Sequence, residues 1–484
     1  PGDAAVPARQ TSLAGSSQPT ARIGSHDVAV TFNHHLSLMH GWVPTTVQVV
    51  TALVLIAAIG WRSRRWRLIW LPFAAGIGGV LAAATYWYIE AQGLSDTSNP
   101  APRSLWVWVA LTGAAVVVLI AGWRTSRWWR RGVSTLAVPM SLLCAALALN
   151  LWVGYFPWVQ TAWSQLTAGP LPDQTDEVTV TAWKREGTIP AQGTVVPVEI
   201  PNTASGFRHR GEYVYLPPAW FASNPAPKLP TVMMIGGEFN TPADWMRAGN
   251  VVKTMDDFAR AHEGYAPVLV FVDPGGAFNN DTECVNGPRG NSADHLTKDV
   301  VPYMDAHYGV SPAAANWGIV GWSMGGTCAV DLAVMHPELF SAFVDIAGDA
   351  GPNSGTKAQT VDRLFGGKTA AWEAFDPATV ITRHGQYQGV AGWFDVNDAT
   401  GVTKTATKVS DQSKAADALC SLGSKHGIAC AVVSQPGTHD WPFASHAFAA
   451  ALPWLAGAIG TPQVPATGLP QSSTSATIVQ TAAK

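Results

Sequence analysis

A serine flanked by glycines, Gly321-Trp322-Ser323-Met324-Gly325, is the pattern that points most directly to chemistry in this 484-residue chain. An apolar run, 317–320, precedes it and predicts a strand. The small-residue stretch 325–335 follows and predicts a helix. A strand-turn-helix arrangement holds the serine in a sharp turn, with its hydroxyl exposed and the glycines letting the helix approach the strand. Ser323 is therefore expected to act as a nucleophile in acyl transfer.

A serine nucleophile needs a base, and in this arrangement the chain order is serine, then acid, then histidine. His439 lies in Pro436-Gly-Thr-His-Asp-Trp441, a predicted loop between the last strand and the last helix. This is the position that the base requires. The other late histidines, His384, His426 and His446, precede the predicted acid strand or lie on predicted helices, and we interpret them as surface or packing residues.

Two carboxylates compete for the role of the acid that orients the histidine. Asp395 and Asp398 both follow the predicted strand 389–394, in Trp393-Phe-Asp-Val-Asn-Asp398. The acid of this arrangement usually lies a few residues beyond the strand end, which favours Asp398. Asp395 remains the alternative, and the carboxylate that is not used would stabilise the loop.

An oxyanion hole needs two backbone N–H groups that point at the developing negative charge. The residue after the nucleophile, Met324, is expected to supply one of them. The second is expected from the segment Gly236-Gly237-Glu238-Phe239 after the third strand, through the backbone of Glu238.

Alternating strands and helices must position these groups. Strands are expected at 195–200, 212–216, 231–235, 268–272, 317–320, 343–346, 389–394 and 429–434, and helices at 251–262, 295–307, 325–335, 413–426 and 443–459. The first two strands are expected at an antiparallel edge. This alternation predicts an α/β-hydrolase fold, a mostly parallel sheet with helices on both faces.

The first third of the chain has a different composition. Four apolar runs, 41–61, 68–89, 105–123 and 133–155, are each long enough to cross a bilayer. Arginines cluster in the first and third loops, whereas the second loop has Arg103 alone. The positive-inside rule therefore predicts a multi-pass plasma-membrane protein with its catalytic domain outside the cytoplasm. No Asp, Glu, Lys or Arg lies in the middle of a run, which favours an anchor over a transporter.

These patterns divide the chain into five parts. We expect a disordered tail at 1–39, the four helices at 40–155, a linker at 156–176, the hydrolase domain at 177–459 and a second disordered tail at 460–484. The net charge of −3 gives no indication of nucleic-acid binding. No Cys or His pair has metal-ligand spacing, so neither a metal nor another cofactor is expected.

Four of the five cysteines, Cys284, Cys328, Cys420 and Cys430, fall in the domain predicted to lie outside the cytoplasm, where disulfides persist. The helix 413–426 and the next strand should bring Cys420 near Cys430. Cys284 and Cys328 then pair by exclusion, which would clamp the loop around Cys284 near the nucleophile helix. Free buried thiols are the alternative. Cys144 lies inside the fourth run and is expected to fill space there.

Residues 195–458 resemble an esterase family of α/β hydrolases that includes esterase D, feruloyl esterases and the antigen 85-type mycolyltransferases of the actinobacterial envelope. The resemblance rests on Gly321-Trp-Ser-Met-Gly-Gly326, His336-Pro-Glu-Leu-Phe340 and Gly437-Thr-His-Asp-Trp-Pro-Phe443. It implies that Ser323 is the nucleophile, His439 the base and Met324 an oxyanion donor. The acid segment departs from the mycolyltransferases, in which the acid is a glutamate in a longer loop.

Two functions are compatible with these residues. The first is a membrane-anchored serine esterase or acyltransferase that forms an acyl-enzyme and acts on a lipid or acylated-glycan substrate of the cell envelope. The second is a non-catalytic envelope binding or scaffold protein that keeps the hydrolase fold. A complete serine, aspartate and histidine set in the right order favours the first.

Overall fold

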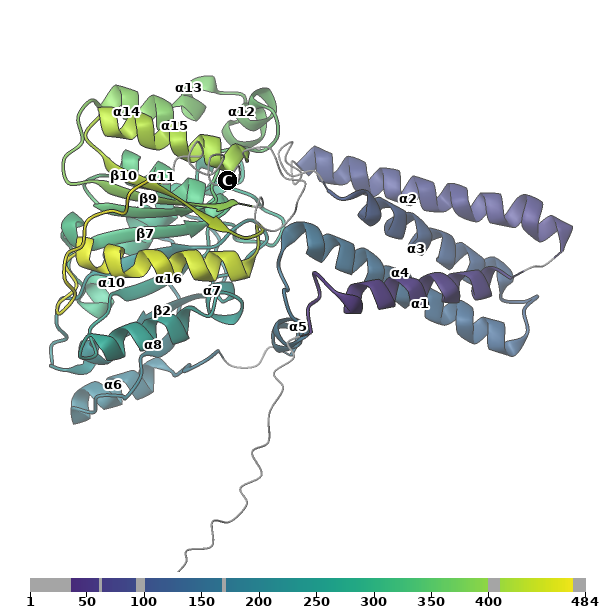
Figure 1. Cartoon of the computed structure of the whole chain (residues 1–484), viewed down its shortest axis with the longest axis horizontal. Helices are drawn as coiled ribbons and strands as arrows, with labels where there is room; N and C mark the ends of the chain where they lie inside the picture. The colour runs from purple at the N-terminus through teal and green to yellow at the C-terminus, as the bar shows by residue number, and fades with distance from the viewer. Residues whose placement is uncertain (1–35, 61–62, 93–100, 168–170, 399–409, 473–484) are drawn as a thin grey trace, which may run out of the picture. The chain divides into compact units, whose positions relative to one another are not determined.

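The computed structural model describes residues 36–60, 63–92, 101–167, 171–398 and 410–472 of the chain (Figure 1). Residues 1–35 of the tail predicted at 1–39, and the last twelve residues of the predicted C-terminal tail, lie outside these ranges.

Four long helices form the N-terminal part of the described chain. They are α1 (Trp42–Ile59), α2 (Leu71–Gln92) with the π-helical turn η1 (Trp66–Trp70) before it, α3 (Arg103–Gly122) and α4 (Trp128–Val153). All four are long and apolar enough to cross a membrane. Helix α3 packs against α2 and α4, and α4 packs against α1. Buried Cys144 on α4 donates to Thr51 on α1 across 3.2 Å, so its thiol fills the α1–α4 contact.

Two helices precede the main sheet. Helix α5 (Val159–Leu166) lies within the segment that was expected to be a linker. Helix α6 (Glu177–Glu186) was not expected from the sequence, although its signals are present: Asp176 caps the first turn by accepting from Thr179 N, and Gly187 ends the helix in a left-handed conformation.

An eight-stranded sheet forms the centre of the remaining chain, in the order β1-β2-β4-β3-β7-β8-β9-β10. Strand β1 pairs antiparallel with β2, and β2 pairs antiparallel with β4, whereas all other neighbours are parallel. The strands are β1 (Thr194–Val198), β2 (Glu212–Leu216), β3 (Thr231–Ile235), β4 (Val268–Val272), β7 (Trp317–Trp322), β8 (Ala342–Ile346), β9 (Ala391–Asp398) and β10 (Ala429–Pro436). A small antiparallel pair, β5 (Asn286–Gly287) and β6 (Gly290–Asn291), stands apart.

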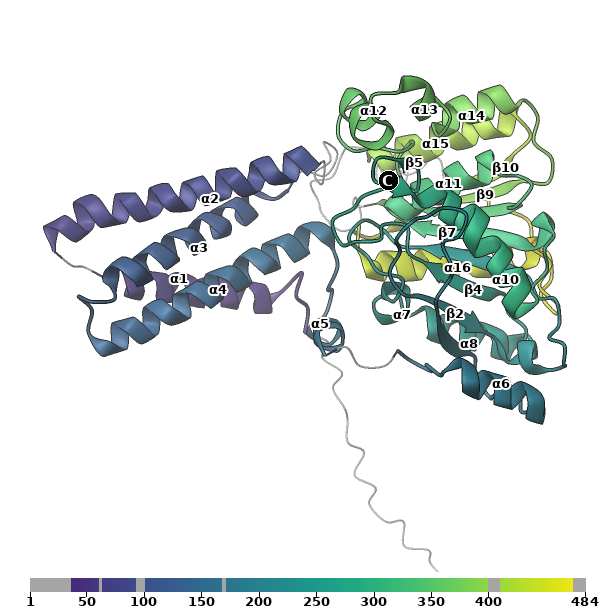
Figure 2. The same cartoon turned by 180° about the vertical axis from the view of Figure 1, so that it is seen from behind.

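Helices cover both faces of this sheet. Figure 1 shows α8 (Val251–Ala261) and α16 (Trp441–Ala458) on the near face, and Figure 2 shows α10 (Val301–Tyr308) and α11 (Met324–Met335) on the other. Helices α14 (Pro377–His384) and α15 (Asp411–Lys425) extend the second layer. The shorter elements are η2 (Pro218–Phe221), α7 (Asp244–Arg247), α9 (Ser292–Asp294), η3 (His295–Val300), η4 (Ala314–Asn316), α12 (Lys357–Phe365) and α13 (Thr369–Glu373).

The core is divided by the sheet into two apolar layers. Along β3, Met233 and Ile235 pack into the layer under α10 and α11, while Val232 and Met234 pack into the layer under α8 and α16. Because successive strand residues point to opposite faces, strands covered on both sides are apolar at every position. The parallel strands in the middle of this sheet therefore appear in the sequence as short, continuous apolar runs.

Both edges of the sheet are covered by chain segments. At β1, Val195 N donates to Asp173 O and Thr175 N donates to Val195 O, at 3.0 and 2.8 Å. At β10, Val432 N donates to the Ser472 hydroxyl at 3.1 Å. Residues 460–472 thus do not behave as the expected disordered tail, because Val464 and Leu469 pack against the α16 layer.

Two disulfides join the four cysteines of the domain as expected. Cys284 is bonded to Cys328, and Cys420 to Cys430, with Cα–Cα distances of 5.7 Å in both pairs. The first bond ties the 281–284 loop to helix α11, and the second ties α15 to the edge strand β10.

Candidate active site

Ser323 occupies the tight turn between β7 and α11. Its φ of 58° and ψ of −120° are strained for a residue with a side chain. The turn is possible because its flanks are glycines: a Cβ on Gly321 would lie 1.7 Å from the Gly325 carbonyl oxygen, and a Cβ on Gly325 would lie 2.4 Å from that of Ile235. Ser323 N donates to Ile346 O at 2.8 Å, which fixes the turn against β8.

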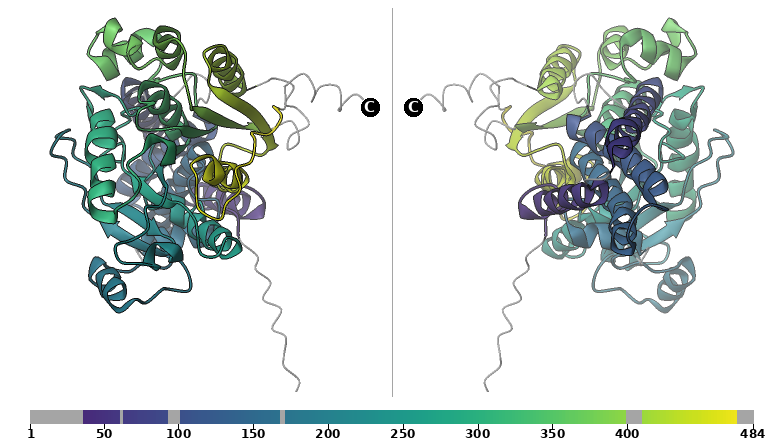
Figure 3. Two further views of the ribbon diagram at one scale, coloured as in Figure 1. Left: turned by 90° about the vertical axis from the view of Figure 1, so that its left-hand side faces the viewer. Right: turned by 90° about the vertical axis from the view of Figure 1, so that its right-hand side faces the viewer.

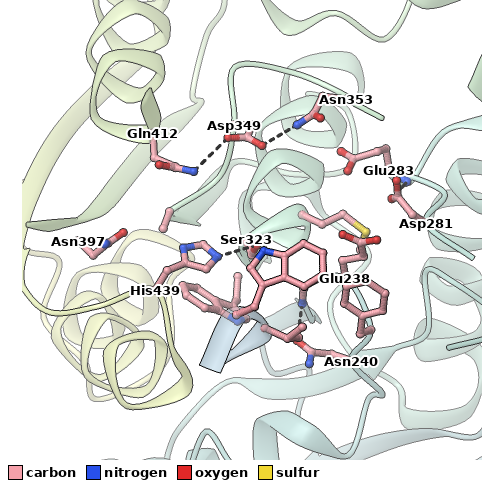
Figure 4. Close-up of a pocket in the computed structure, with 17 residues that line it drawn as sticks. Glu238, Asn240, Asp281, Glu283, Ser323, Asp349, Asn353, Asn397, Gln412 and His439 are labelled. Atoms are coloured by element: carbon pink, nitrogen blue, oxygen red, sulfur yellow. Dashed lines mark hydrogen bonds between the residues drawn. The ribbon is translucent and has the colours of Figure 1, made fainter. Parts of the chain in front are cut away.

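His439 reaches the serine from the loop between β10 and α16. Its Nε2 lies 2.9 Å from Ser323 Oγ, as Figure 4 shows. The imidazole packs on the Trp322 ring with centroids 4.2 Å apart, and the neighbouring Asp440 caps α16 by accepting from Phe443 N. Burial lowers the pKa of His439 to about 4. The ring is thus neutral near pH 7 and can accept the proton of the serine hydroxyl.

The two candidate acids occupy different places. Asp398 is the last residue of β9 and pairs in register with Pro436, three residues before His439; its side chain lies outside the described part of the structure. Asp395 is fully buried within β9, where it accepts hydrogen bonds from Trp393 Nε1 and Gln435 Nε2. Burial raises the pKa of Asp395 to about 6. Among the described side chains, the hydrogen-bond partners of the Asp395 carboxylate are Trp393 and Gln435 rather than His439.

The loop after β3 lies beside Ser323 and is closed by the side chain of Asn240. Asn240 Oδ1 accepts from Gly237 N at 2.9 Å, and a Cβ on Gly237 would lie 3.2 Å from Ser323 Cβ. The Gly237 amide is therefore already hydrogen-bonded within the loop. The next amide along the chain is that of Glu238, the residue expected to supply the second oxyanion donor. On the other side, Met324 begins α11, and the first amides of a helix have no partner within it.

A partly buried arginine supports this loop from outside. Arg210 donates to both carboxylate oxygens of Asp273, at 2.6 and 3.0 Å, and to the Asn240 carbonyl oxygen at 2.7 Å. Asp273 is fully buried, and its pairing with Arg210 holds the pKa of this carboxyl below its ordinary value against the effect of burial. An ion pair thus fixes the backbone of the loop that carries Glu238.

The serine and histidine open into a pocket of about 250 Å³ with many polar side chains. In Figure 4, Asp349 lies between Gln412 and Asn353, accepting from them at 3.4 and 2.6 Å. The carboxylates that line the pocket are those of Glu238, Asp281, Glu283 and Asp349.

Asp281 and Glu283 make one wall of this pocket acidic and buried. Burial raises the pKa of Asp281 to about 6, although Arg289 lies 3.3 Å from its carboxylate. Burial, reinforced by the charge of Asp281, also raises the pKa of Glu283 well above its ordinary value. Glu283 Oε2 has no hydrogen-bond partner among the described residues. The wall can therefore both donate and accept hydrogen bonds near neutral pH.

One group of side chains away from the serine has the composition of a metal site. His209, Glu212 and His295 bring their ligand atoms within 4.8 Å of one another. The ring nitrogens of His295 lie 3.1 and 3.3 Å from carboxylate oxygens of Glu212 and Asp299, and those of His209 lie 2.8 and 2.9 Å from backbone carbonyl oxygens. All four ring nitrogens thus lie within hydrogen-bonding distance of oxygens of the protein.

Sequence reasoning missed most of the pocket. Asn240, Asp281, Glu283, Asp349, Asn353, Asn397 and Gln412 were not expected at the site, although all line it. They come from the loops after β3, β4 and β8, from the carboxyl end of β9 and from the first turn of α15, and no local spacing links these five places. Asn240 had a signal, since it closes the Gly-Gly segment already selected for the oxyanion hole.

The sheet order, the strained serine turn and the histidine after the last strand define an α/β hydrolase. The family model described as "Putative esterase" matches residues 207–455, and the chain belongs to that family. An uncharacterised protein of Corynebacterium glutamicum is 27% identical over 416 residues, which are 82% of this chain and 93% of that protein.

Several solved structures are similar over the hydrolase domain. A ferulic acid esterase is 19% identical with a TM-score of 0.45, covering 56% of this chain and 99% of its own. The S-formylglutathione hydrolase of Agrobacterium tumefaciens is 18% identical with a TM-score of 0.44, covering 55% and 95%. MPT51 of Mycobacterium tuberculosis is 18% identical with a TM-score of 0.38, covering 54% and 99%.

Proposed function

We propose that this protein is a membrane-anchored serine esterase or acyltransferase that acts on acyl esters of the cell envelope. The observation that carries the proposal is the 2.9 Å contact between His439 Nε2 and Ser323 Oγ, made where the serine lies in a strained turn at the start of α11. A neutral, partly buried imidazole at this distance is suited to remove the hydroxyl proton.

The reaction would proceed through an acyl-enzyme. Ser323 Oγ attacks the ester carbonyl carbon while His439 takes its proton, and the amides of Met324 and Glu238 stabilise the oxyanion. The tetrahedral intermediate collapses when His439 returns the proton to the leaving alcohol. Water, or a sugar hydroxyl, then attacks the acyl-enzyme with the same base and releases the acid or the new ester.

Asp398 is proposed as the acid that orients His439. The parallel register places it beside Pro436 at the strand end from which the His439 loop departs. Asp395 is the weaker candidate, because Trp393 and Gln435 already donate to its carboxylate.

The lining of the pocket bears on the substrate. Four carboxylates and four amide side chains are suited to hydroxyl-rich groups rather than to a long hydrocarbon chain. A cavity of about 250 Å³ is also small beside the roughly 300–1,000 Å³ of common ligand pockets. We therefore propose that the buried part of the substrate is a short acyl group on a polyol or glycan. The acidic wall would also repel a free carboxylate product.

The four apolar helices support the anchoring part of the proposal, and the two disulfides support a domain outside the cytoplasm. A reporter fusion at each loop tests the topology. An alkaline phosphatase fused after residue 472 should be active, and one fused in the α1–α2 loop should be inactive; the reverse pattern would contradict the orientation.

A fluorophosphonate probe tests the chemistry. The full chain in detergent should be labelled covalently, and Ser323→Ala should not be labelled. Ser341→Ala serves as the matched control, because Ser341 lies in the same domain outside the pocket. If the wild type and Ser323→Ala are labelled equally, or neither is labelled while both remain folded, the non-catalytic scaffold becomes the better interpretation. Profiling short and long acyl esters with and without sugar acceptors then distinguishes hydrolysis from transfer.

A further inference from the structure

A second cavity, of about 830 Å³, lies within the four-helix part of the chain. It opens where the α1–α2 and α3–α4 connections meet, the end of the bundle that is nearest the viewer in the right-hand view of Figure 3. Its polar lining comes from both connections: Ser63 and Arg65 from the first, and Thr125, Ser126, Arg127 and Arg130 from the second. Trp66, Trp70 and Trp129 supply apolar walls.

Among the described residues, the charge at this end of the helical part is entirely positive. Residues 36–153 contain two carboxylates, Glu90 and Asp96, of which Asp96 lies outside the described residues and Glu90 lies near the C-terminal end of α2. The described arginines at this end are Arg64, Arg65, Arg67, Arg124, Arg127, Arg130 and Arg131. At a rise of roughly 1.5 Å per residue, α2 places Glu90 roughly 29 Å from its first residue, Leu71. Glu90 therefore cannot neutralise the arginines that line the cavity.

Hydrogen-bond donors in the cavity lack partners as well. Ser126 Oγ and Arg130 Nε are buried and have no hydrogen-bond partner among the described residues. The guanidinium of Arg130 is folded into the bundle: it stacks over the Trp129 ring at 5.0 Å, and a Cβ on Gly60 would lie 2.7 Å from its Nη1. Arg127 is the N-cap of α4, so the first amides of a 26-residue helix lie at the same place.

Membrane orientation alone does not require this arrangement. Arginines that set topology need only lie in water on the correct side, and Arg64 and Arg124 are exposed without lining the cavity. Arg65 and Arg127, which are also exposed, converge with half-buried Arg130 from two connections on one cavity, beside a helix N-terminus that favours negative charge. Guanidinium groups bind phosphate oxygens in a bidentate manner.

We propose that this cavity binds the phosphate headgroup of an anionic membrane lipid. A lone phosphate ion would fill a small part of 830 Å³, whereas a lipid would place its glycerol and first methylenes against the tryptophan walls. Tryptophan is the side chain that favours this depth of the bilayer. The site is separate from the esterase chemistry, so the two can fail independently.

Lipid retention tests this inference with a charge-matched control. The full chain is purified from nanodiscs that contain phosphatidylglycerol and phosphatidylcholine, and retained lipids are counted by native mass spectrometry. The cavity triple variant is Arg65→Gln, Arg127→Gln and Arg130→Gln. The control triple variant, Arg64→Gln, Arg103→Gln and Arg124→Gln, removes the same charge but none of the cavity lining.

The wild type and the control should retain phosphatidylglycerol in preference to phosphatidylcholine, and the cavity variant should bind it roughly a hundredfold more weakly than the control. Equal losses in the two triple variants, or equal retention of both lipids by the wild type, would overturn the proposal. Displacement of the lipid by millimolar inorganic phosphate would show a site for the free ion and overturn the lipid assignment. If the triple variant does not fold by circular dichroism, Ser126→Ala replaces it and should weaken binding several-fold.

Discussion

Ser323 is held in a conformation that only its glycine neighbours make possible, and the loop that faces it is held just as firmly. The Asn240 side chain accepts a hydrogen bond from Gly237 N within that loop. Arg210 donates to the Asn240 carbonyl oxygen and also to the Asp273 carboxylate. An oxyanion hole acts because its donors are already in place when charge develops. Residues that never touch the substrate are therefore expected to influence the rate.

Replacing Asn240 with alanine tests this positioning role. The Gly237 amide loses its partner and the loop relaxes, so kcat for a short p-nitrophenyl ester should fall at least tenfold with little change in KM. Asn353→Ala is the control, because Asn353 also lines the pocket but bonds to Asp349. Partial recovery in Asn240→Asp would fit the role of the side-chain oxygen. A rise in KM with unchanged kcat would contradict it.

The pH dependence of the reaction tests the choice of acid. Burial alone lowers the pKa of His439 to about 4, and an ionised carboxylate beside the ring would raise it again. Asp398→Asn should therefore lower kcat and move the acidic limb of kcat/KM to lower pH, because the neutral base then persists further into acid. Asp395→Asn should leave the position of the limb unchanged. The opposite pattern would make Asp395 the acid.

At the scale of secondary-structure elements, the two disulfides can be compared because they close loops of different length and join different segments. Cys284–Cys328 spans 44 residues and fixes the acidic wall to α11, whereas Cys420–Cys430 spans 10 residues and ties α15 to an edge strand. Loop-closure entropy predicts stabilisation of roughly 4 and roughly 3 kcal/mol respectively.

Double serine variants separate stability from activity. Both should lower the free energy of unfolding by amounts in that range. Only Cys284→Ser with Cys328→Ser should also reduce kcat, since it releases the loop that carries Asp281 and Glu283. Chemical denaturation together with esterase assays well below each midpoint measures the two effects. Equal activity in the two variants would show that the Cys284–Cys328 bond is not required to position Asp281 and Glu283.

Most strands could be predicted from the sequence, and the reason is physical. Strands buried on both faces are short apolar runs between glycines and charged turns, so β3, β4 and β7 began at the expected residues. Helix α12 was missed because its apolar face is short, although Thr356 and Gln359 form a complete capping box before it. The C-terminal segment was missed because its composition resembles that of a disordered tail, and only packing distinguishes the two.

The contact between Ser323 and His439 could be predicted for a similar reason, since each residue lies in a local sequence pattern. The acidic wall could not. Asp281 and Glu283 approach Ser323 only through the fold of a long loop and the disulfide that ties it down. Which of two nearby carboxylates serves His439 also depends on side-chain direction, and sequence spacing carries no information about that.

The whole domain holds several carboxyl groups in its interior. Burial raises the pKa of Asp345 to about 7 and that of Asp395 to about 6, and it raises the pKa of Asp331 well above its ordinary value of 3.8. Such a carboxyl group has a higher pKa in the folded state than in the unfolded state. It stabilises the fold fully at pH values below its unfolded-state pKa, and this stabilisation is lost as the pH rises through its folded-state pKa. His439 has the opposite effect: because its pKa is lowered from 6.5 to about 4, its contribution to stability is lost as the pH falls through that range.

Because the carboxyl groups outnumber this histidine, the melting temperature of the domain should be higher near about pH 5 than near about pH 8. Asp331→Asn provides the sharper measurement. Both carboxylate oxygens of Asp331 are buried without hydrogen-bond partners among the described residues. The variant should raise the melting temperature near about pH 8 and leave it nearly unchanged near about pH 5. A uniform shift at both pH values would rule out titration as the cause.

The segments that cover β1 and β10 have a consequence for how copies of this protein behave beside one another. An open sheet offers a row of unpaired amides and carbonyls at each edge, and such rows pair readily with a strand from another molecule. Here residues 173–175 occupy the first edge and Ser472 reaches the second. In the proposed membrane-anchored state, copies of the protein would meet often, and a domain with uncovered sheet edges would then be prone to pair edge to edge. The two covering segments make the hydrolase a poor template for its neighbours.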